Sequence, residues 1–364
     1  MKYILVAGAR PNFMKIAPIM DAFARRKTAS NDFSVSLIHT GQHYDRKMSD
    51  DFFADLGIPE PDINLAVGSG THAEQTARVM VAFERVCHGE HPDWVVVVGD
   101  VNWTLACSIT AKKLGIRVAH VEAGLRSRDM SMPEEINRLC TDAISDCLFT
   151  TDELAGDNLR REGVPNHRLH FVGNTMIDTL LRCIDRARAR PLPAGLETKR
   201  YAVLTLHRPQ NVDDPSVLAG ILSAVGVVAD RMPVVFPVHP RTAKSLDSLP
   251  RHPNLRIAEP LSYLPFLGLV ANSRMVMTDS GGLQEETTVL GIPCLTMRPN
   301  TERPMTCEVG TNVLTGSDPD RIRNAARAIL ANGMPPGRIP DKWDGHAAER
   351  IVEILLNEDP VFVR

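Results

Sequence analysis

The sequence lacks several patterns that would place it in a common class of protein. Its 44 acidic residues slightly outnumber its 41 basic residues, so its formal net charge is −3. This balance offers no basic surplus for nucleic acid or for an anionic membrane surface. No apolar run approaches the roughly 20 residues needed to span a bilayer. We therefore expect no nucleic-acid partner and no membrane partner, and we expect basic residues to act locally.

The cysteine and histidine spacings also lack the usual patterns of bridges and metal sites. The seven cysteines are odd in number, and no two form a Cys-x-x-Cys pair. Neither a disulfide framework nor a zinc site is indicated, and thiols in a reducing cytoplasm are expected. The segment His88-Gly89-Glu90-His91 does not match the His-Glu-x-x-His spacing of a zinc helix. We predict a cytoplasmic protein with no bound metal.

Short apolar runs alternate with longer amphipathic stretches along the chain. Continuous hydrophobicity, as in the Val-rich run 94–98, is typical of a parallel strand buried on both faces. Six strand–helix units therefore predict a first doubly wound α/β domain. The expected strands are 2–8, 34–39, 94–99, 117–121, 147–150 and 169–172, and the expected helices are 12–26, 47–55, 72–87, 103–114, 135–146 and 153–163.

The alternation then restarts after an expected helix at 174–188 and a Pro-containing connector at 189–195. The fold class predicted is α/β, with two doubly wound Rossmann-like domains facing across a cleft. Ligands bind such sheets outside the carboxyl ends of the strands. A last helix at 344–357 could pack on either domain. The strands expected in the second domain are 201–206, 233–238, 254–258, 274–278, 293–297 and 311–314.

Residues 274–286 combine an apolar strand, a turn of small residues and the start of a helix. Backbone N–H groups at such a turn point out of the positive end of the helix dipole and suit a phosphate. Ser280 could cap the helix, and Gly281 and Gly282 allow close approach of a ligand. The carboxylate of Glu286 could accept hydrogen bonds from sugar hydroxyls. An ordinary capped turn is the alternative interpretation.

Cationic residues follow the first expected strand. Arg10 and Lys15 would flank the start of a helix that begins near Pro11, a residue suited to the first helical position. They would add positive donors for a diphosphate. A solvated helix start is the alternative. Gly-x-Gly-x-x-Gly is absent after this strand, so a dinucleotide fingerprint is not indicated.

Three carboxylates could converge at one rim of the first sheet. Asp100 and Glu122 end neighbouring strands, and Glu134 opens a helix soon afterwards. Adjacent carboxylates in a partly closed crevice raise one another's pKa, which places a proton donor beside a base. Asp100 could instead cap a helix, and Glu134 could complement a helix dipole. Glu122 is harder to explain this way, because an unpaired buried acid is costly.

In the second domain, His207 lies beside Arg208 at a strand end, where it could meet a leaving phosphate. His239 also follows a strand, although a lone histidine is usually structural. Arg303 follows a later strand and could close on a diphosphate or stabilise the interdomain geometry. In the first domain, His43 follows the second strand, where the residues alone favour a turn.

Taken in register, these segments resemble the non-hydrolysing bacterial UDP-N-acetylglucosamine 2-epimerases. The resemblance runs from about residue 3 to about residue 315. The matching motifs are Gly8-Ala9-Arg10-Pro11, Thr40-Gly41-Gln42-His43, Gly99-Asp100, His120-Val121-Glu122-Ala123-Gly124-Leu125-Arg126, Pro133-Glu134-Glu135-Ile136-Asn137-Arg138, Gly173-Asn174-Thr175, His207-Arg208, Thr278-Asp279-Ser280-Gly281-Gly282-Leu283-Gln284-Glu285-Glu286 and Thr301-Glu302-Arg303-Pro304.

The resemblance implies a fold like that of the GT-B glycosyltransferases, with the C-terminal helix returning to the first domain. The domains would then be 1–172 with 344–364, and 173–343. It also implies a homodimeric isomerase without a cofactor that interconverts UDP-GlcNAc and UDP-ManNAc. UDP is eliminated through 2-acetamidoglucal and then added back. Such an enzyme supplies ManNAc-type sugars for bacterial surface polysaccharide.

The resemblance also implies roles for individual residues. Its acid–base carboxylates match Asp100, Glu122 and Glu134, its histidine near the diphosphate matches His207, and Glu286 would contact the ribose. The remaining expected substrate contacts are Arg10, Lys15, His43, Arg138, His239, Ser280, Gly281, Gly282 and Arg303.

Four alternatives stay open from the sequence. A 2-epimerase of another UDP-sugar, such as a diacetamido uronate, would tend to alter the segments at Glu285-Glu286 and Glu302-Arg303-Pro304, which are retained here. A hydrolysing epimerase would release free ManNAc. A GT-B glycosyltransferase would have no obvious use for three carboxylates, and a sensor without catalysis would tolerate their loss.

Overall fold

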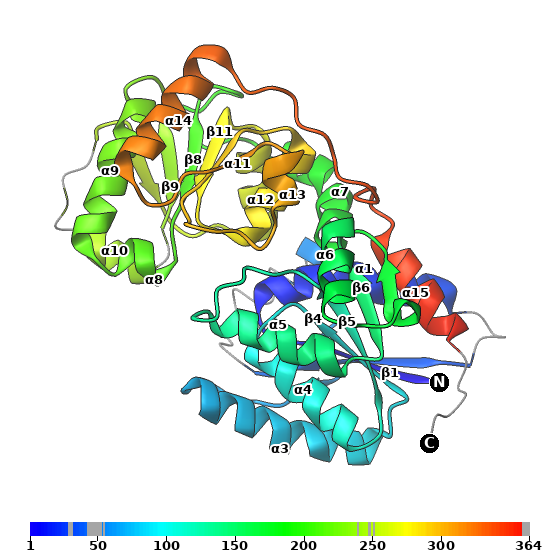
Figure 1. The fold of residues 1–364 in the computed structure, drawn as a ribbon. Coiled ribbons are helices and arrows are strands. Elements are labelled where there is room, and N and C mark those ends of the chain that lie inside the picture. Colours follow the sequence, from blue (N-terminus) through cyan, green and yellow to red (C-terminus); the bar gives the residue numbers. More distant parts are fainter. Residues whose placement is uncertain are drawn as a thin grey trace. The chain divides into compact units, whose positions relative to one another are not determined.

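The computed structural model describes residues 1–27, 32–41, 53, 55–238, 240–246, 249 and 252–358. Contacts within the chain divide it into two compact units (Figure 1). The first, here called the N-unit, comprises Met1–Thr179 and Asp341–Arg364, and the second, the C-unit, comprises Leu180–Pro340. The chain therefore leaves the N-unit once and returns to it at its end.

The N-unit is built on a parallel sheet in the order β3-β2-β1-β4-β5-β6-β7. This doubly wound order was predicted, but the predicted count of six strands was wrong. The additional strand is β3, which spans only Ile63–Asn64 and is partly exposed, so it leaves almost no hydrophobic signal. The strands are β1 Lys2–Ala7, β2 Ser34–His39, β3 Ile63–Asn64, β4 Trp94–Val98, β5 Arg117–Ala123, β6 Cys147–Thr150 and β7 Leu169–Phe171.

Helices follow the strands of the N-unit, and their apolar sides cover the sheet. Side chains of α3 and α4, including Phe83 and Ala106, form one core cluster with Ile4, Val95 and Val118 of the strands. These strands are Val- and Ile-rich because the sheet is covered by helices. The helices are α1 Arg10–Arg26, α3 His72–Glu90, α4 Asn102–Lys113, α5 Pro133–Ile144, α6 Glu153–Arg161 and α15 Ala347–Asn357, with a 3₁₀ turn at Asn166–Arg168. A further helix, α7 Thr175–Arg188, begins in the N-unit and continues into the C-unit.

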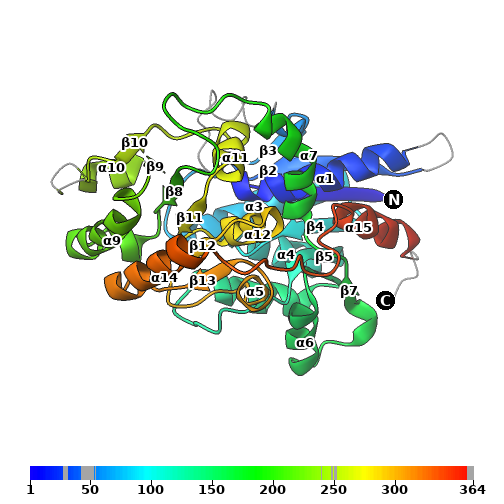
Figure 2. The same ribbon diagram turned by 90° about the horizontal axis from the view of Figure 1, so that it is seen from above.

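The last helix, α15, packs beside α1 within the N-unit (Figure 2). The hydroxyl of Tyr3 in β1 donates a hydrogen bond of 2.9 Å to the carbonyl oxygen of Leu355. At the other end of α15, the carboxylate of Asp178 accepts hydrogen bonds from the N–H groups of Ala347 and Ala348. The two ends of the chain are thus joined in one core.

The C-unit contains a second parallel sheet, in the order β10-β9-β8-β11-β12-β13. Its strand order again reverses beside the first strand of the unit, as in the N-unit. The α/β class and the doubly wound order predicted from the sequence are confirmed in both units. The strands are β8 Ala202–Thr205, β9 Val234–Pro237, β10 Leu255–Ala258, β11 Met275–Thr278, β12 Cys294–Thr296 and β13 Asn312–Leu314.

Both faces of the C-unit sheet are covered. One core cluster joins Leu204 and Phe236 to α9 and α14 through Ile221 and Ile322. A second cluster joins Val203 and other alternate strand residues to α11 and α12. The helices are α8 Pro209–Val212, α9 Pro215–Ala229, α10 Pro240–Leu246, α11 Tyr263–Ala271, α12 Gly281–Leu290, α13 Met305–Glu308 and α14 Pro319–Asn332.

Several sequence predictions fall on residues that the structure does not describe. These are the candidate contacts His43 and His239, the side chain of the candidate contact Arg10, and most of the helix expected at 47–55. In the part of the chain that is described, no helix has both the length and the apolar character required to cross a bilayer. None of the seven cysteines, all of which lie in the described part, forms a disulfide.

Candidate active site

The candidate catalytic groups of the N-unit lie at the carboxyl ends of β1, β4 and β5. The order of the sheet reverses between β1 and β4, and ligands bind doubly wound sheets at such a switch point. The register pairs Val98 of β4 with Val121 of β5, so Gly99 and Glu122 come one residue further along adjacent strands and Asp100 comes two residues further. The structure therefore brings Asp100 and Glu122 to one edge.

Glu122 is held as a buried ion pair with Lys15 of α1. Their side chains are 5% and 9% exposed. Removing one partner of such a pair leaves an uncompensated buried charge, which is strongly destabilising. The sequence assigned Lys15 to a diphosphate, whereas in this structure its ammonium contacts the carboxylate. Glu122 also has φ +74°, a conformation that costs an ordinary residue free energy and that clusters at functional sites.

The backbone beside the Lys15–Glu122 ion pair leaves room for the ammonium and carboxylate groups. The register between β5 and β6 shifts between Val121 and Ala123, and such a bulge redirects a side chain. Gly99 has φ +69°, and a Cβ there would lie 3.1 Å from the Lys15 Nζ and 3.5 Å from a Glu122 carboxylate oxygen. Glycine at this position therefore adopts the positive φ without strain, and it has no Cβ that would crowd the ion pair.

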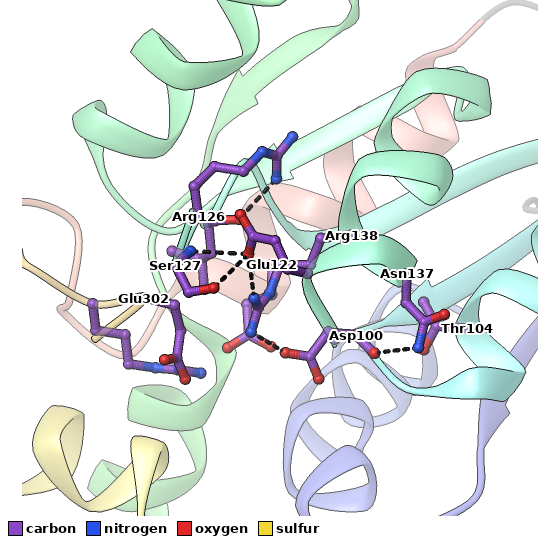
Figure 3. A network of polar contacts seen from close by, with 12 residues as sticks. Asp100, Thr104, Glu122, Arg126, Ser127, Asn137, Arg138 and Glu302 are labelled. Atoms are coloured by element: carbon purple, nitrogen blue, oxygen red, sulfur yellow. Dashed lines mark hydrogen bonds and ion pairs between the residues drawn. The ribbon is translucent and has the colours of Figure 1, made fainter. Parts of the chain in front are cut away.

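Asp100 is bound by Arg138 of α5, and Figure 3 shows the two side chains pointing toward each other. The other guanidinium nitrogen of Arg138 lies 2.8 Å from Glu135. Asn137 donates to the backbone carbonyl oxygen of Asp100 at 2.9 Å. The alternative role of Asp100 as a helix cap is wrong, because Val101 precedes α4 and no side chain caps that helix.

Glu135 fixes the loop before α5. Burial would raise the pKa of Glu135, but hydrogen bonds from Ser127 and Arg128 and the charge of Arg138 lower it on balance. Glu135 is therefore an anion that orients Arg138, a role that the sequence analysis missed. Glu134, its neighbour in the first turn of α5, is partly exposed. Among the described residues, Glu134 has no hydrogen-bond or ion-pair partner.

A second buried network of hydrogen bonds and ion pairs contacts the backbone at Gly99, next to Asp100. His120 of β5 has its Nδ1 atom 2.6 Å from Asp142 and its Nε2 atom 2.8 Å from the Gly99 carbonyl oxygen. Asp142 also contacts Arg126 at 2.7 Å. Burial would raise the pKa of Asp142, yet the charges and hydrogen bonds of His120 and Arg126 lower it. These residues hold the Gly99 turn in place. Asp142 was missed because it lies in the last turn of α5 with no motif around it.

In the C-unit, His207 and Asp279 meet where the order of the sheet reverses, after β8 and β11. The Nδ1 atom of His207 lies 2.8 Å from Asp279, and half of the His207 side chain is exposed whereas Asp279 is fully buried. The Asp279 carboxylate also accepts hydrogen bonds from the backbone N–H of Arg208 and from the Asn211 side chain. Burial would raise the pKa of Asp279, but His207 and these donors lower it.

The buried Asp279 carboxylate therefore orients His207 and can stabilise positive charge on its imidazole. Asp279 lies within the turn that the sequence analysis emphasised, but its partnership with His207 was missed. The signal was present in the pattern, since polar residues ending the two strands on either side of a switch point are expected to meet.

The helix α12 begins at Gly281, directly after this turn. Ser280 occupies the capping position, but the prediction that its side chain caps the helix is wrong. Instead its backbone N–H donates to the Thr278 hydroxyl at 2.9 Å. The first N–H groups of α12 thus have no side-chain cap, a feature that suits an anion at this helix end.

Arg303 packs against the same helix end. It lies 2.7 Å from Glu285 and 2.5 Å from Glu302, and its side chain is 9% exposed. A Cβ on Gly281 would lie 2.9 Å from both Arg303 and Glu302. The glycine therefore permits the close approach of this buried charge network to the turn. Gly282 follows in the first turn of the helix.

Glu286 is a buried acid one turn further along α12. The Tyr263 hydroxyl donates a 3.0 Å hydrogen bond to its carboxylate. Burial, with a smaller contribution from the Glu285 charge, raises the pKa of Glu286 to about 7, although the bond from Tyr263 lowers it. A buried acid of this kind gains from hydroxyl donors on a ligand. Tyr263 was missed because it lies outside every motif.

Comparison with known proteins identifies the family. The chain belongs to the UDP-N-acetylglucosamine 2-epimerase family, whose model matches residues 25–356. A Methanococcus maripaludis protein named UDP-N-acetylglucosamine 2-epimerase is 39% identical over 371 residues, which cover 97% of this chain and 98% of the relative. The family and the isomerase class predicted from the sequence are confirmed.

Two further proteins bear on fold and substrate. A crystal structure of Methanocaldococcus jannaschii UDP-GlcNAc 2-epimerase in complex with UDP-GlcNAc and UDP has 40% sequence identity and a TM-score of 0.86, and it covers 98% of this chain and 99% of that chain. This likeness confirms the predicted GT-B-like fold class. A Pseudomonas aeruginosa UDP-2,3-diacetamido-2,3-dideoxy-D-glucuronate 2-epimerase is 40% identical over 98% of this chain and 99% of the relative.

Proposed function

We propose that this protein is a non-hydrolysing UDP-GlcNAc 2-epimerase that interconverts UDP-GlcNAc and UDP-ManNAc. One observation carries the proposal: two carboxylates, Glu122 and Asp100, end adjacent strands, and each is bound to its own buried cation. Family membership and a relative solved with UDP-GlcNAc and UDP support the same substrate. The cation beside each carboxylate compensates its negative charge within a buried site.

In the proposed reaction, a carboxylate of the N-unit removes the proton from C2 of the sugar. The C–H electrons form a double bond between C1 and C2, and the C1–O bond breaks to release UDP, which leaves 2-acetamidoglucal. UDP then adds back to C1 while C2 takes a proton on the opposite face. Inversion requires carboxyl groups on both faces, and we assign Glu122, Asp100 and Glu134 to this set.

The C-unit holds the uridine diphosphate in this proposal. The uncapped start of α12 at Ser280, Gly281 and Gly282 would receive the phosphates. His207, oriented by Asp279 at 2.8 Å, would supply positive charge to the diphosphate as it leaves C1. Glu286 would accept hydrogen bonds from the ribose hydroxyls. Arg303 would act by holding the turn rather than by direct contact, because it is already paired with Glu285 and Glu302.

The diacetamido uronate epimerase is the second candidate, because the Pseudomonas aeruginosa relative is equally similar. A uronate carries an additional carboxylate, which needs a cation of its own. At the catalytic edge of the N-unit, Lys15 contacts Glu122, Arg138 contacts Asp100, and Arg126 contacts Asp142. These three cations are therefore committed to protein acids, which favours the uncharged N-acetyl sugar.

The experiment is incubation with UDP-GlcNAc in heavy water, followed by proton NMR. We expect UDP-ManNAc to appear with deuterium at C2 of both sugars. Free ManNAc would indicate a hydrolysing enzyme, and turnover only of the diacetamido uronate would transfer the assignment to the second candidate. Glu122→Gln should stop deuterium uptake, whereas Glu84→Gln, a substitution on the exposed side of α3, should not change it.

We also infer a homodimer that works in the cytoplasm and provides ManNAc-type sugars for surface polysaccharide. The odd number and scattered spacing of the cysteines support the cytoplasmic location, because this pattern is typical of proteins in a reducing compartment. Light scattering during gel filtration measures the mass in solution, with twice 40.1 kDa expected. A mass of one chain would contradict the dimer and leave the proposed reaction intact.

A further inference from the structure

Three potential metal ligands meet in the N-unit at the end of the last helix. Cys147 is the first residue of β6, His170 is in the neighbouring strand β7, and Glu358 caps the end of α15. One donor atom of each lies within 4.8 Å of the donor atoms of the other two. The sequence could not reveal this set, because its members are far apart in the chain and share no spacing.

The donor groups of this cluster are unsatisfied. The Nε2 atom of His170 is buried and has no hydrogen-bond partner. Within the described ranges, the thiol of Cys147 and the carboxylate of Glu358 likewise form no hydrogen bond or ion pair. A buried polar atom left unpaired costs free energy. The orientation of the His170 ring is fixed by packing on Phe149, with the ring centroids 5.6 Å apart.

The chemistry of the donors fits a zinc ion. Thiolate, imidazole and carboxylate are all zinc ligands, and in a tetrahedral site their donor atoms lie about 3.5 Å apart. Movements on the order of 1 Å would therefore close this cluster around an ion. Cys147 is buried, whereas His170 and Glu358 are partly exposed. The partly exposed side gives an ion access from the solvent.

The charges nearby are compatible with this assignment. Once the Cys147 thiol has lost its proton to the solvent, the thiolate and the Glu358 carboxylate together neutralise a divalent ion. Burial raises the pKa of Cys147 to about 12, the charges of Glu358 and Asp146 also raise it, and the cations Arg117 and Arg168 act in the opposite direction. A bound metal deprotonates a coordinating thiol outright.

We propose that Cys147, His170 and Glu358 form a zinc site that ties the end of α15 to strands β6 and β7. The site is structural. Cys147 pairs with Ala119 in the first half of β5, whereas Glu122 lies at the bulge near the other end of that strand. The proposal is therefore independent of the reaction proposed above.

The test uses the full chain after removal of metal with a chelator. Cobalt(II) is the probe, because a cobalt–thiolate bond produces a charge-transfer absorption in the near ultraviolet. We expect uptake of one cobalt ion per chain with this absorption, and displacement by added zinc. Cys147→Ser should abolish the absorption, and Glu358→Gln should weaken zinc binding by about tenfold or more. Cys140→Ser, at an exposed cysteine, is the matched control and should bind as the wild type does.

A second measurement does not depend on the folding of a variant. Zinc should raise the Tm of the wild-type protein and protect Cys147 from alkylation by iodoacetamide. Absence of the cobalt–thiolate absorption, or an absorption that persists in Cys147→Ser, would overturn the proposal. So would alkylation of Cys147 at the same rate with and without zinc, which would instead identify a reactive thiol.

Discussion

Two buried acids of the C-unit have environments that push their pKa values in opposite directions. Asp279 is surrounded by donors and by His207, and its pKa is lowered. Glu286 has one hydroxyl donor and a second carboxylate nearby, and burial raises its pKa to about 7. At neutral pH, Asp279 is therefore an anion, while Glu286 is partly protonated. Pairs of acids that differ in this way are typical of functional sites.

The raised pKa of Glu286 predicts a pH-dependent cost to stability. The folded protein holds this proton up to about pH 7, whereas the unfolded chain loses it near pH 4.5, so the cost grows between these values. The shift corresponds to roughly 3 kcal/mol. We expect Glu286→Gln to be more stable than the wild type above pH 7 without ligand, and equally stable near pH 4. Urea unfolding at several pH values measures this, and a difference independent of pH would contradict it.

The partnership of Asp279 with His207 predicts a defect in catalysis larger than the defect in binding. Asp279→Asn keeps the size of the side chain but removes the charge that stabilises a positive imidazole. We expect kcat to fall by about 100-fold, with UDP affinity within about tenfold of the wild type. Steady-state kinetics and calorimetry measure the two quantities. Equal losses in both would indicate that Asp279 only maintains the fold.

At the scale of elements, the start of α12 depends on a close approach. Gly281→Ala would place a Cβ 2.9 Å from Arg303 and from Glu302, so the charge network must shift away from the turn. We expect a loss of stability of about 1 kcal/mol and UDP binding weakened by about tenfold. Gly226→Ala is the control, since a Cβ on that α9 residue meets no atom within 4 Å. It should stabilise the helix slightly and leave UDP binding unchanged.

Long elements with a strong pattern were predictable from the sequence. The Val-rich strand β4 and the alternation of strands and helices gave the doubly wound class, because burial on both faces requires continuous apolar runs. The two-residue strand β3 was not predictable, since it buries too little apolar surface to leave a pattern. Strand-end positions also predicted that Asp100 and Glu122 share an edge.

The pairing of charges within the site was less predictable. Lys15 was expected to face a phosphate, but it contacts Glu122, because a buried carboxylate needs a partner. Ser280 was expected to cap α12, but the turn is instead held by Thr278 and Asp279. Such choices depend on which side chains meet across neighbouring strands and helices, and strand-end positions do not specify them.

At the scale of the whole molecule, α15 is held by an acid from another part of the chain. The Asp178 carboxylate accepts the N–H groups of Ala347 and Ala348, the first residues of that helix. Asp178→Ala would leave both buried donors unpaired, and we expect a loss of stability of about 1–3 kcal/mol. Asp185→Ala, at an exposed position of α7, should be nearly neutral. Hydrogen exchange should accelerate within α15 of Asp178→Ala, and unchanged exchange would contradict this role.

The return of the chain to the N-unit has a consequence for its synthesis on the ribosome. The Tyr3 hydroxyl of the first strand donates a hydrogen bond to Leu355. The residues synthesised first therefore complete their contacts only after α15 has been synthesised. The C-unit, Leu180–Pro340, is continuous and can fold before the final helix has emerged from the ribosome. Domains generally fold as units in the order of their synthesis, but here the half that is made first is completed last. A chain that ends at residue 340 would thus contain the whole C-unit but an N-unit that lacks α15.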